Sequence, residues 1–530
     1  MSVAERASGG LTGPRVLPRV RLGLLGTILL IGGICSLPLL LYLPFYTEPF
    51  MRDEGLYAAF AQIMQHGGIP YQDAFDDKPP LIFGWFYLSF VIFGEHLWAP
   101  RLLAALLLSG TTLLMYVEGR LLFSHRYGML AAAAFALSFS LATLETSANT
   151  EFFMLPPLVA ALVTFTLGLK SGRWEWYALS GLLSGVAIAT KEVSLFSWVL
   201  FIGIAAAPHL KSLGWRAYSA PGFRRSVGGL IGGCFVAFIA VIAPFAATGS
   251  LPDLFDGTVI FTLHYLGVVP LTTKLQAMAR LPLYLTFVLG PWLILPVLGL
   301  LQIKSHGANG WGTLLAGWLL AGCIGILAVG RFFDHYFITL LPPLALLVPL
   351  GLTYIGKRWR SLGKKQYLPL AATLVLLMPV VVAVQIAQNA TIFAKPTADE
   401  RHNAKYPHDN RAPWESDGPE MGAWLAARTE PDEPIWNFGF QSEIYFYADR
   451  RSPTRFIMDR PFWYSESYVD QALVELNENK PVYVIDSAIY EKWSNGKLYT
   501  TRIKDWIVAN YDYVGKVYYA DIWRLKAVDS

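Results

Sequence analysis

Long apolar runs alternate with short charged segments along most of this 530-residue chain. A helix of about 20 residues, within a range of roughly 17–25, crosses the hydrocarbon core of a membrane. We therefore expect an all-α polytopic membrane domain with about eleven transmembrane helices and additional interfacial helices. The expected crossings are 22–47, 102–117, 127–144, 152–169, 176–190, 193–208, 226–252, 281–303, 307–330, 336–356 and 366–394.

Two irregularities in the apolar pattern refine this path. The run 81–94 has only fourteen residues, so we expect an interfacial or re-entrant helix rather than a crossing. The stretch 177–208 is interrupted by Lys191-Glu192. As a single helix at ~1.5 Å per residue it would be roughly 50 Å long, which exceeds a core of ~30 Å. We therefore expect a hairpin with the two charges at its tip.

The basic residues near the runs are unevenly distributed. Most of them lie in the amino-terminal segment and in every second loop, provided that 81–94 does not cross. Because basic residues are retained on the cytoplasmic side, residues 1–21 should be cytoplasmic and the carboxyl terminus should lie outside. This topology predicts a multi-pass protein of the cytoplasmic membrane, with a transmembrane domain over 22–394 and a first outer loop over 48–101.

The composition changes after residue 394. Residues 397–434 are rich in charge, proline and asparagine, which predicts a linker or loop. Beyond it, strand-like segments alternate with helix-like segments, so we expect a small extracytoplasmic α/β domain over 395–530. The expected strands are 434–440, 454–458, 482–486 and 514–520, and the expected helices are 467–477 and 503–509.

Composition excludes several classes of protein. The chain is 54% hydrophobic and 15% charged, with a mean hydropathy of +0.42, which excludes a water-soluble enzyme. A net charge of +4 is too small for a nucleic-acid binder. The three cysteines lie in apolar runs without metal-ligand spacing, so we interpret them as buried small residues.

With this topology, acidic and basic residues of separate outer loops lie at one side of the membrane. Charges at membrane depth are costly and usually face a cavity or a partner, so such a group is a candidate functional site. The alternative interpretation is a set of helix-end charges at the headgroup layer. The candidate residues are Asp53, Glu54, Tyr57, Asp77, Lys78, Glu151, Lys191, Arg331 and His335.

The first outer loop carries the most specific pattern. Asp53-Glu54 is followed by Tyr57 and, some twenty-five residues after the acidic pair, by Asp77-Lys78-Pro79-Pro80. This pattern resembles the bacterial relatives of protein O-mannosyltransferases, including the lipid A aminoarabinose transferase, which are membrane glycosyltransferases of the GT-C fold that use polyprenyl-phosphate sugars.

Two further segments are similar to this family over residues 22–356. Glu151 occupies the place of an acid before the fourth span, although aspartate is commoner there. The segment 330–337, with Arg331 and His335, is similar to the stretch before a late span in many bacterial members. The segment 395–530 has no transferable motif.

The resemblance implies transfer of a sugar from a polyprenyl-phosphate donor to a lipid, glycan or protein acceptor, with inversion at the anomeric carbon. Such a reaction needs a carboxylate at the acceptor and cations at the leaving phosphate. We expect Asp53 to be the general base, with Glu54 orienting it or the acceptor. Lys78 and Arg331 are expected at the phosphate, with Lys191 and His335 as further candidates. Glu151 is a further catalytic candidate, and Tyr57 and Asp77 are expected to contact the donor or substrate.

Several alternatives stay open from the sequence. No cofactor is required, yet Asp53, Glu54 and Glu151 offer oxygen ligands to a divalent cation, so metal dependence is undecided. A transporter or flippase of a lipid-linked sugar is the alternative function, although its charges would be expected near the midplane. A non-catalytic sensor whose outer domain binds sugar is a third interpretation. The sugar, the acceptor and the oligomeric state are undetermined.

Overall fold

A computed structural model describes residues 23–139, 147–264, 271–289, 293–305, 310–329, 333–361, 390, 392, 394–405, 417–487 and 500–527. The chain divides into two units. The helical unit contains Met1–Pro44, Leu102–Val241 and Val269–Thr391. The mixed unit contains Phe45–Arg101, Ile242–Val268 and Ile392–Ser530.

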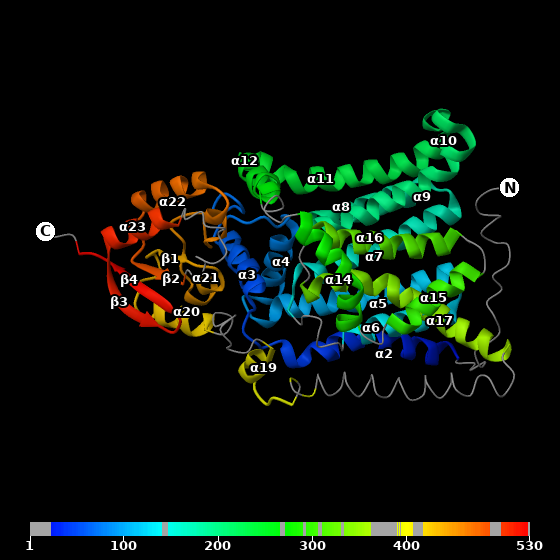
Figure 1. Ribbon diagram of the computed structural model, residues 1–530, viewed down its shortest axis with the longest axis horizontal. Coiled ribbons are helices and arrows are strands. Elements are labelled where there is room, and N and C mark those ends of the chain that lie inside the picture. The colour runs from blue at the N-terminus through cyan, green and yellow to red at the C-terminus, as the bar shows by residue number, and fades with distance from the viewer. Residues whose placement is uncertain are drawn as a thin grey trace. The chain divides into compact units, whose positions relative to one another are not determined.

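The helical unit is built from long apolar helices, seen in Figure 1 from blue α2 to yellow-green α17. Helix α5 begins in a segment of the mixed unit, and helix α11 ends in another segment of that unit. The helices are α2 (Leu24–Tyr42), α5 (Trp98–Leu122), α6 (His125–Ser138), α7 (Thr150–Ser171), α8 (Trp174–Thr190), α9 (Leu195–Leu213), α11 (Gly229–Thr248), α14 (Leu271–Leu289), α15 (Ile294–Ser305), α16 (Gly310–Val329) and α17 (Leu341–Ser361). Shorter turns connect them: η1 (Leu43–Phe45), η2 (Glu192–Ser194), η3 (Gly214–Ser219), α10 (Pro221–Phe223), η4 (Arg224–Gly228) and η7 (Asp334–Leu340).

The protein is a multi-pass membrane protein. Among the described residues, seven segments are long and apolar enough to cross a membrane: Leu24–Phe45, Trp98–Leu122, Thr150–Ser171, Glu192–Ser219, Pro221–Thr248, Trp311–Val329 and His335–Arg358. The expected crossing 176–190 corresponds to α8, which has 17 residues. The expected crossing 281–303 is divided between α14 and α15. Run 127–144 lies partly, and run 366–394 almost wholly, outside the described residues, so the number eleven stays a prediction.

The helix ends follow from local chemistry. The side chain of Asn149 caps α7 by accepting a hydrogen bond from the Thr150 amide at 2.7 Å. Helix α8 ends at Lys191, whose backbone is extended (φ −153°, ψ 122°), and α9 begins at Leu195. The predicted break of the long apolar stretch at Lys191 is therefore confirmed. The predicted short helix over 81–94 is also present, as α4 (Leu81–Phe93), which ends at Gly94 with φ +83°.

The mixed unit combines helices with a four-stranded sheet of order β1-β2-β4-β3. Strands β1 (Ile435–Phe438) and β2 (Tyr483–Asp486) are parallel, with Ile435 opposite Tyr483, whereas β4 (Ala520–Leu525) is antiparallel to both β2 and β3 (Tyr511–Val517). This arrangement confirms a small α/β part in the carboxy-terminal region. The helices of the unit are α3 (Arg52–Gln65), α4, α12 (Leu251–Phe255), the π-helix η5 (Asp256–Phe261), α19 (Ala398–Lys405), α20 (Gly418–Ala426), α21 (Glu443–Ala448), η8 (Arg460–Trp463), α22 (Glu466–Glu478) and α23 (Thr501–Asn510).

One hydrophobic core joins distant segments of the mixed unit. Trp436 of β1 and Val484 of β2 pack with apolar residues of α22 and α23, which lie along one side of the sheet in Figure 1. Phe75 of the first loop and Phe261 of η5 belong to the same core, and their ring centroids lie 5.4 Å apart. The first loop, the segment 242–268 and the carboxy-terminal sheet are therefore packed into one structure.

One strand prediction is wrong, and another is correct only for residues 514–517, which belong to β3. Residues 454–458 form no strand, because other groups satisfy their backbone: the Arg455 amide donates to Glu475, the Phe456 amide to the Thr454 hydroxyl, and the Arg455 carbonyl accepts from the Phe75 amide. The run 514–520 is not one strand, because it contains the turn of a hairpin. It bends at Tyr518, which has φ +53°, so β3 ends at Val517 and β4 begins at Ala520.

Candidate active site

Asp53 and Glu54 lie in the first turn of α3 but have different environments. Glu54 is fully buried and accepts two hydrogen bonds from Arg101, at 2.9 Å from Nε and 2.6 Å from Nη2. It also accepts the Met51 amide at 3.2 Å, which closes a capping box at the helix start. Both acids are favourably placed at the positive end of the helix dipole.

Arg101 fixes the segment that leads into α3. Its guanidinium donates to the carbonyl oxygens of Phe45, Glu48 and Pro49 at 2.6–2.9 Å, in addition to Glu54. Because every donor of this buried cation is directed at a backbone or carboxylate oxygen, the approach to α3 has a defined path. Glu54 is therefore turned away from solvent, and its bonds to Arg101 and to the Met51 amide fix the first turn of α3.

Asp53, in contrast, is 21% exposed. Its Oδ1 lies 3.5 Å from Nε of Arg52, and the Arg52 guanidinium stacks over the ring of Phe440 at 4.2 Å from the centroid. Phe440 in turn stacks on Trp463, with 5.9 Å between their ring centroids. The carboxy-terminal part of the mixed unit therefore holds the side chain next to Asp53.

The acidic-Lys-Pro-Pro segment contains a group of four charges. Lys78 Nζ donates to Asp77 Oδ1 at 3.1 Å. Arg460 of η8 donates through Nη2 to Asp76 Oδ1 and to Asp77 Oδ1, each at 2.5 Å. We call Asp76, Asp77, Lys78 and Arg460 the loop cluster. Asp53 lies close enough to interact electrostatically with Lys78.

Burial and neighbouring charges shift the pKa values of the loop cluster. Burial raises the pKa of Asp76 to about 7; Lys78 opposes this shift, and the adjacent Asp77 carboxylate adds to it. Burial also disfavours ionisation of Asp77, but Arg460 and Lys78 outweigh it and lower the pKa of that carboxyl. Lys78 has a raised pKa, because Asp77 and Asp76 outweigh the effect of its burial. Lys78 is therefore a permanent cation at neutral pH.

Two buried tyrosines, Tyr57 and Tyr71, pack next to the Asp77-Lys78-Pro79-Pro80 segment and helix α4. Tyr71 is fully buried with φ +70°, and its hydroxyl donates to the Lys78 carbonyl at 2.6 Å. Tyr57 is also fully buried, and its ring packs edge-on against Phe83 and Phe86 of α4. Tyr57, predicted as a substrate contact, therefore packs α3 on α4 in this structure.

The helical unit holds the other predicted residues. Glu151, in the first turn of α7, is fully buried and forms an ion pair with Lys191, at the break between α8 and α9. Thr150 accepts a hydrogen bond from Lys191 Nζ at 3.0 Å and donates one to Glu151 at 3.0 Å. The Lys191 ammonium lies 4.4 Å from the centroid of the Tyr336 ring.

His335 of η7 is 8% exposed and near enough to Glu151 to interact electrostatically. Thus three separate segments of the helical unit meet at the Glu151–Lys191 pair. Arg331, predicted at the donor phosphate, lies outside the described residues.

Two of the three side chains offered to a divalent cation, Glu54 and Glu151, are already paired with basic residues. Both carboxylate oxygens of Glu54 are bonded to Arg101, and Glu151 is paired with Lys191. In the part of the chain that the structure describes, no three acidic, histidine or cysteine side chains converge on one point. We therefore assign no step to a metal ion.

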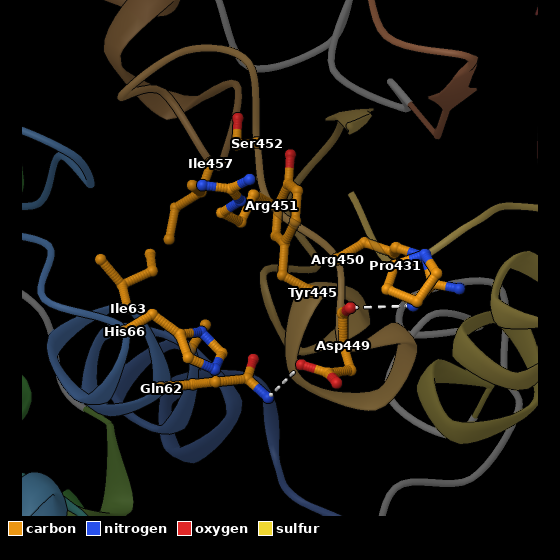
Figure 2. A pocket seen from close by; sticks show the side chains of 11 residues that line it. Gln62, Ile63, His66, Pro431, Tyr445, Asp449, Arg450, Arg451, Ser452 and Ile457 are labelled. Atoms are coloured by element: carbon orange, nitrogen blue, oxygen red, sulfur yellow. Dashed lines mark hydrogen bonds between the residues drawn. The ribbon is translucent and has the colours of Figure 1, made fainter. Parts of the chain in front are cut away.

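A cavity of about 360 Å³ lies in the mixed unit at the far end of α3. Figure 2 shows Gln62 of α3 and His66, which follows the helix, on one side and Tyr445, Asp449 and Arg451 on the other. Gln62 donates to Asp449 Oδ1 across its floor at 3.2 Å. A helix rises ~1.5 Å per residue, so the α3 residues that line this cavity lie roughly 10–20 Å along the helix from Asp53. The cavity is therefore separate from the group of residues around Asp53.

Sequence reasoning missed the arginines of this site. Arg101 and Arg460 supply the cations that pair with Glu54, Asp76 and Asp77, yet no motif surrounds either arginine. Arg460 is 384 residues away from Asp76, so no local spacing could have indicated the pair. The sequence does contain one indication: Asp76-Asp77-Lys78 has two acidic residues and one basic residue. This imbalance predicts a second basic residue nearby but not its position in the chain.

The fold and one segment of the sequence match known proteins. Residues 77–217 match the family model described as dolichyl-phosphate-mannose-protein mannosyltransferase. ArnT from Cupriavidus metallidurans, solved with undecaprenyl phosphate bound, is similar in structure with a TM-score of 0.58 and 14% identity, over 94% of this chain and 98% of that chain. No curated protein sequence matches.

An archaeal structure is also similar. The Archaeoglobus fulgidus oligosaccharyltransferase tethered with an acceptor peptide has a TM-score of 0.51 and 13% identity, over 94% of this chain and 74% of that chain. The chain therefore shares its fold with these two structures. Over residues 77–217 the sequence also resembles the dolichyl-phosphate-mannose-protein mannosyltransferases.

Proposed function

We propose that the protein transfers a sugar from a polyprenyl-phosphate donor to a hydroxyl group of a lipid, glycan or protein acceptor, with inversion at the anomeric carbon. The family match and the undecaprenyl phosphate bound to the similar ArnT support the donor class. The observation that carries the proposal is the proximity of a partly exposed carboxylate, Asp53, and a permanent cation, Lys78, in the mixed unit.

The proposed reaction breaks the bond between the anomeric carbon and the phosphate oxygen and forms a bond to the acceptor oxygen. Asp53 accepts the proton of the acceptor hydroxyl, a contribution of typically about 10²–10⁴-fold in rate. The ammonium of Lys78 stabilises the negative charge that grows on the leaving phosphate. Asp53, at 21% exposure, and Lys78, at 25%, both remain open to a substrate.

The other predicted residues take supporting roles in this proposal. Glu54 is a positioning residue, because its pair with Arg101 fixes the turn that carries Asp53. Asp77 orients Lys78 through their hydrogen bond. Glu151 and Lys191 hold the α7 start against the α8–α9 break, and His335 borders them. Arg331 and His335 stay predicted phosphate contacts.

We also propose that the mixed unit lies on the extracytoplasmic side of the cytoplasmic membrane, with the amino terminus inside. The uneven distribution of basic residues supports this orientation. A cysteine introduced at position 122, at the end of α5, should resist an impermeant thiol reagent added from outside. Labelling of that cysteine in intact cells would reverse the orientation.

The function is tested by incubating the purified protein with a panel of polyprenyl-phosphate sugars and following donor consumption by mass spectrometry. The wild type should consume one donor, and Asp53→Asn should lose about 10²–10⁴-fold in rate. Asp505→Asn is the matched control, since Asp505 is an exposed residue of α23, and it should keep the wild-type rate.

Two results would contradict the proposal. Equal rates in the wild type and in Asp53→Asn would remove Asp53 from the chemistry. Transport of an intact donor across liposomes, with no donor consumed, would replace the transferase with a transporter.

A further inference from the structure

Arg460 is a largely buried cation that the chemistry above does not use. It lies at the start of η8 and is 12% exposed. One terminal nitrogen, Nη2, donates to both Asp76 Oδ1 and Asp77 Oδ1. Asp76 is fully buried and Asp77 is 10% exposed, so these pairs are poorly screened by solvent. The carboxy-terminal sheet region thereby binds the segment that carries Lys78.

The charge balance of the loop cluster depends on this arginine. Asp76 and Asp77 carry two negative charges when ionised, and Lys78 and Arg460 carry two positive charges. Without Arg460, Lys78 would face both carboxyl groups alone, and wherever Asp76 is ionised the cluster would have a net negative charge. A negative cluster repels an anionic phosphate, and an ammonium shared by two carboxylates has less capacity to bind one.

The surroundings of Arg460 make its loss harder to compensate. Asp459 precedes it, is fully buried, and interacts electrostatically with Arg460 and with Asp486 at the end of β2. The Arg460 guanidinium also lies 5.4 Å from the Phe261 ring centroid. Asp459 and Phe261 thus place a further acid and an apolar ring next to Arg460, and Lys78 is the other cation of the loop cluster.

A second arginine of the same region, Arg455, also contacts the first loop, donating to the Tyr71 carbonyl at 3.4 Å, and has acidic partners of its own. Arg455 donates to Asp253 at 3.3 Å and to Asp256 at 2.8 Å, both in segment 242–268. It is 7% exposed, so it matches Arg460 in burial and in having two acidic partners. Its partners are not the carboxylates that hold Lys78. Arg455 therefore separates a general packing effect from the charge balance of the loop cluster.

We propose that Arg460 is a positioning residue of the donor site: by pairing with Asp76 and Asp77, it leaves the ammonium of Lys78 available to the donor phosphate. This role rests on the proposed function for its kinetic consequence. In this proposal, a residue of the carboxy-terminal region, Arg460, contributes to the phosphate site although that region contains no recognised motif.

The test compares Arg460→Met, Arg460→Lys, Arg455→Met and the double variant Arg460→Met/Asp76→Asn in the full-length protein in detergent. We expect Arg460→Met to raise the donor KM about tenfold or more with a smaller change in kcat, because a buried charge pair has been broken. Arg460→Lys should recover most of the affinity. The double variant should also recover it, because removing one acid restores the charge balance. Arg455→Met should leave the donor KM unchanged.

Binding of undecaprenyl phosphate, measured by calorimetry on the same variants, separates the two proposals. If the wild type binds this lipid but consumes no sugar donor, the transferase proposal fails while the role of Arg460 is still tested by binding. Weaker binding in Arg460→Met, with recovery in the double variant, supports the role. A double variant as weak as Arg460→Met, or an equal loss in Arg455→Met, overturns it.

Discussion

Each unit contains a lysine paired with a carboxylate, and the two pairs differ in what surrounds them. In the mixed unit, the side chains of Asp77 and Lys78 are 10% and 25% exposed. In the helical unit, those of Glu151 and Lys191 are 0% and 7% exposed. Arg460 provides the first pair with a second cation, whereas Thr150 and the Tyr336 ring enclose the second.

We infer from this difference in burial and charge balance that the Asp77–Lys78 pair suits anion binding and that the Glu151–Lys191 pair is structural. In a buried ion pair neither charge is hydrated, so each charge depends on its partner. Removing one partner leaves an uncompensated buried charge and lowers the free energy of unfolding. A partly exposed lysine whose carboxylate neighbours are shared with an arginine keeps the capacity to bind an incoming anion. We therefore expect the two lysines to respond to substitution in different ways.

The largest expected effect on stability is in the helical unit. Lys191→Met leaves the Glu151 carboxylate buried without its cation, and should lower the free energy of unfolding by about 3–5 kcal/mol. Thermal unfolding in detergent measures this change. The double variant Glu151→Gln/Lys191→Met should recover much of the loss, because the uncompensated charge is gone. A single variant as stable as the wild type would show that the two residues do not form a buried ion pair.

A smaller effect is expected from pH in the mixed unit. The pKa of Asp76 in the folded protein is raised by burial to about 7, so the folded state binds this proton more tightly than the unfolded chain. The contribution of Asp76 to the free energy of unfolding is therefore fully present below its unfolded pKa of about 4. It is lost as the pH rises through its folded pKa of about 7. Asp459, whose pKa is raised to about 7 by burial, acts in the same sense.

Asp76→Asn isolates the contribution of one carboxyl. Between pH 5 and pH 8 the fall in unfolding free energy should be smaller in the variant by about 1–3 kcal/mol. The lowered pKa of Asp77 has the opposite sign, but its contribution is lost only as pH falls below about 4, outside this window. Parallel stability curves for variant and wild type would contradict the burial of Asp76.

Local patterns predicted the elements whose causes are local. The break at Lys191 followed from the length of its apolar stretch, and α4 from a run too short to cross. Residues 454–458 have strand-like composition, yet Glu475 and the Thr454 hydroxyl take their backbone amides. Such competition between partners distant in sequence is not visible in a local pattern.

The candidate site divides in the same way. Asp53 and Lys78 were predicted from the first loop itself, and the structure describes both as partly exposed. The sequence predicts that Glu54 orients Asp53 or the acceptor, and only the position of Arg101 shows that Glu54 faces away from solvent. Arg460 pairs with the same loop from the other end of the chain, a relation set by tertiary packing.

The most direct test of the donor-phosphate site is the single-turnover rate of sugar transfer by Lys78→Ala. The account predicts a rate about 10²–10³-fold below the wild type, because a fixed cation is removed from the leaving phosphate, with a melting temperature close to that of the wild type. Transfer at the wild-type rate would contradict the account and place the phosphate elsewhere in the molecule.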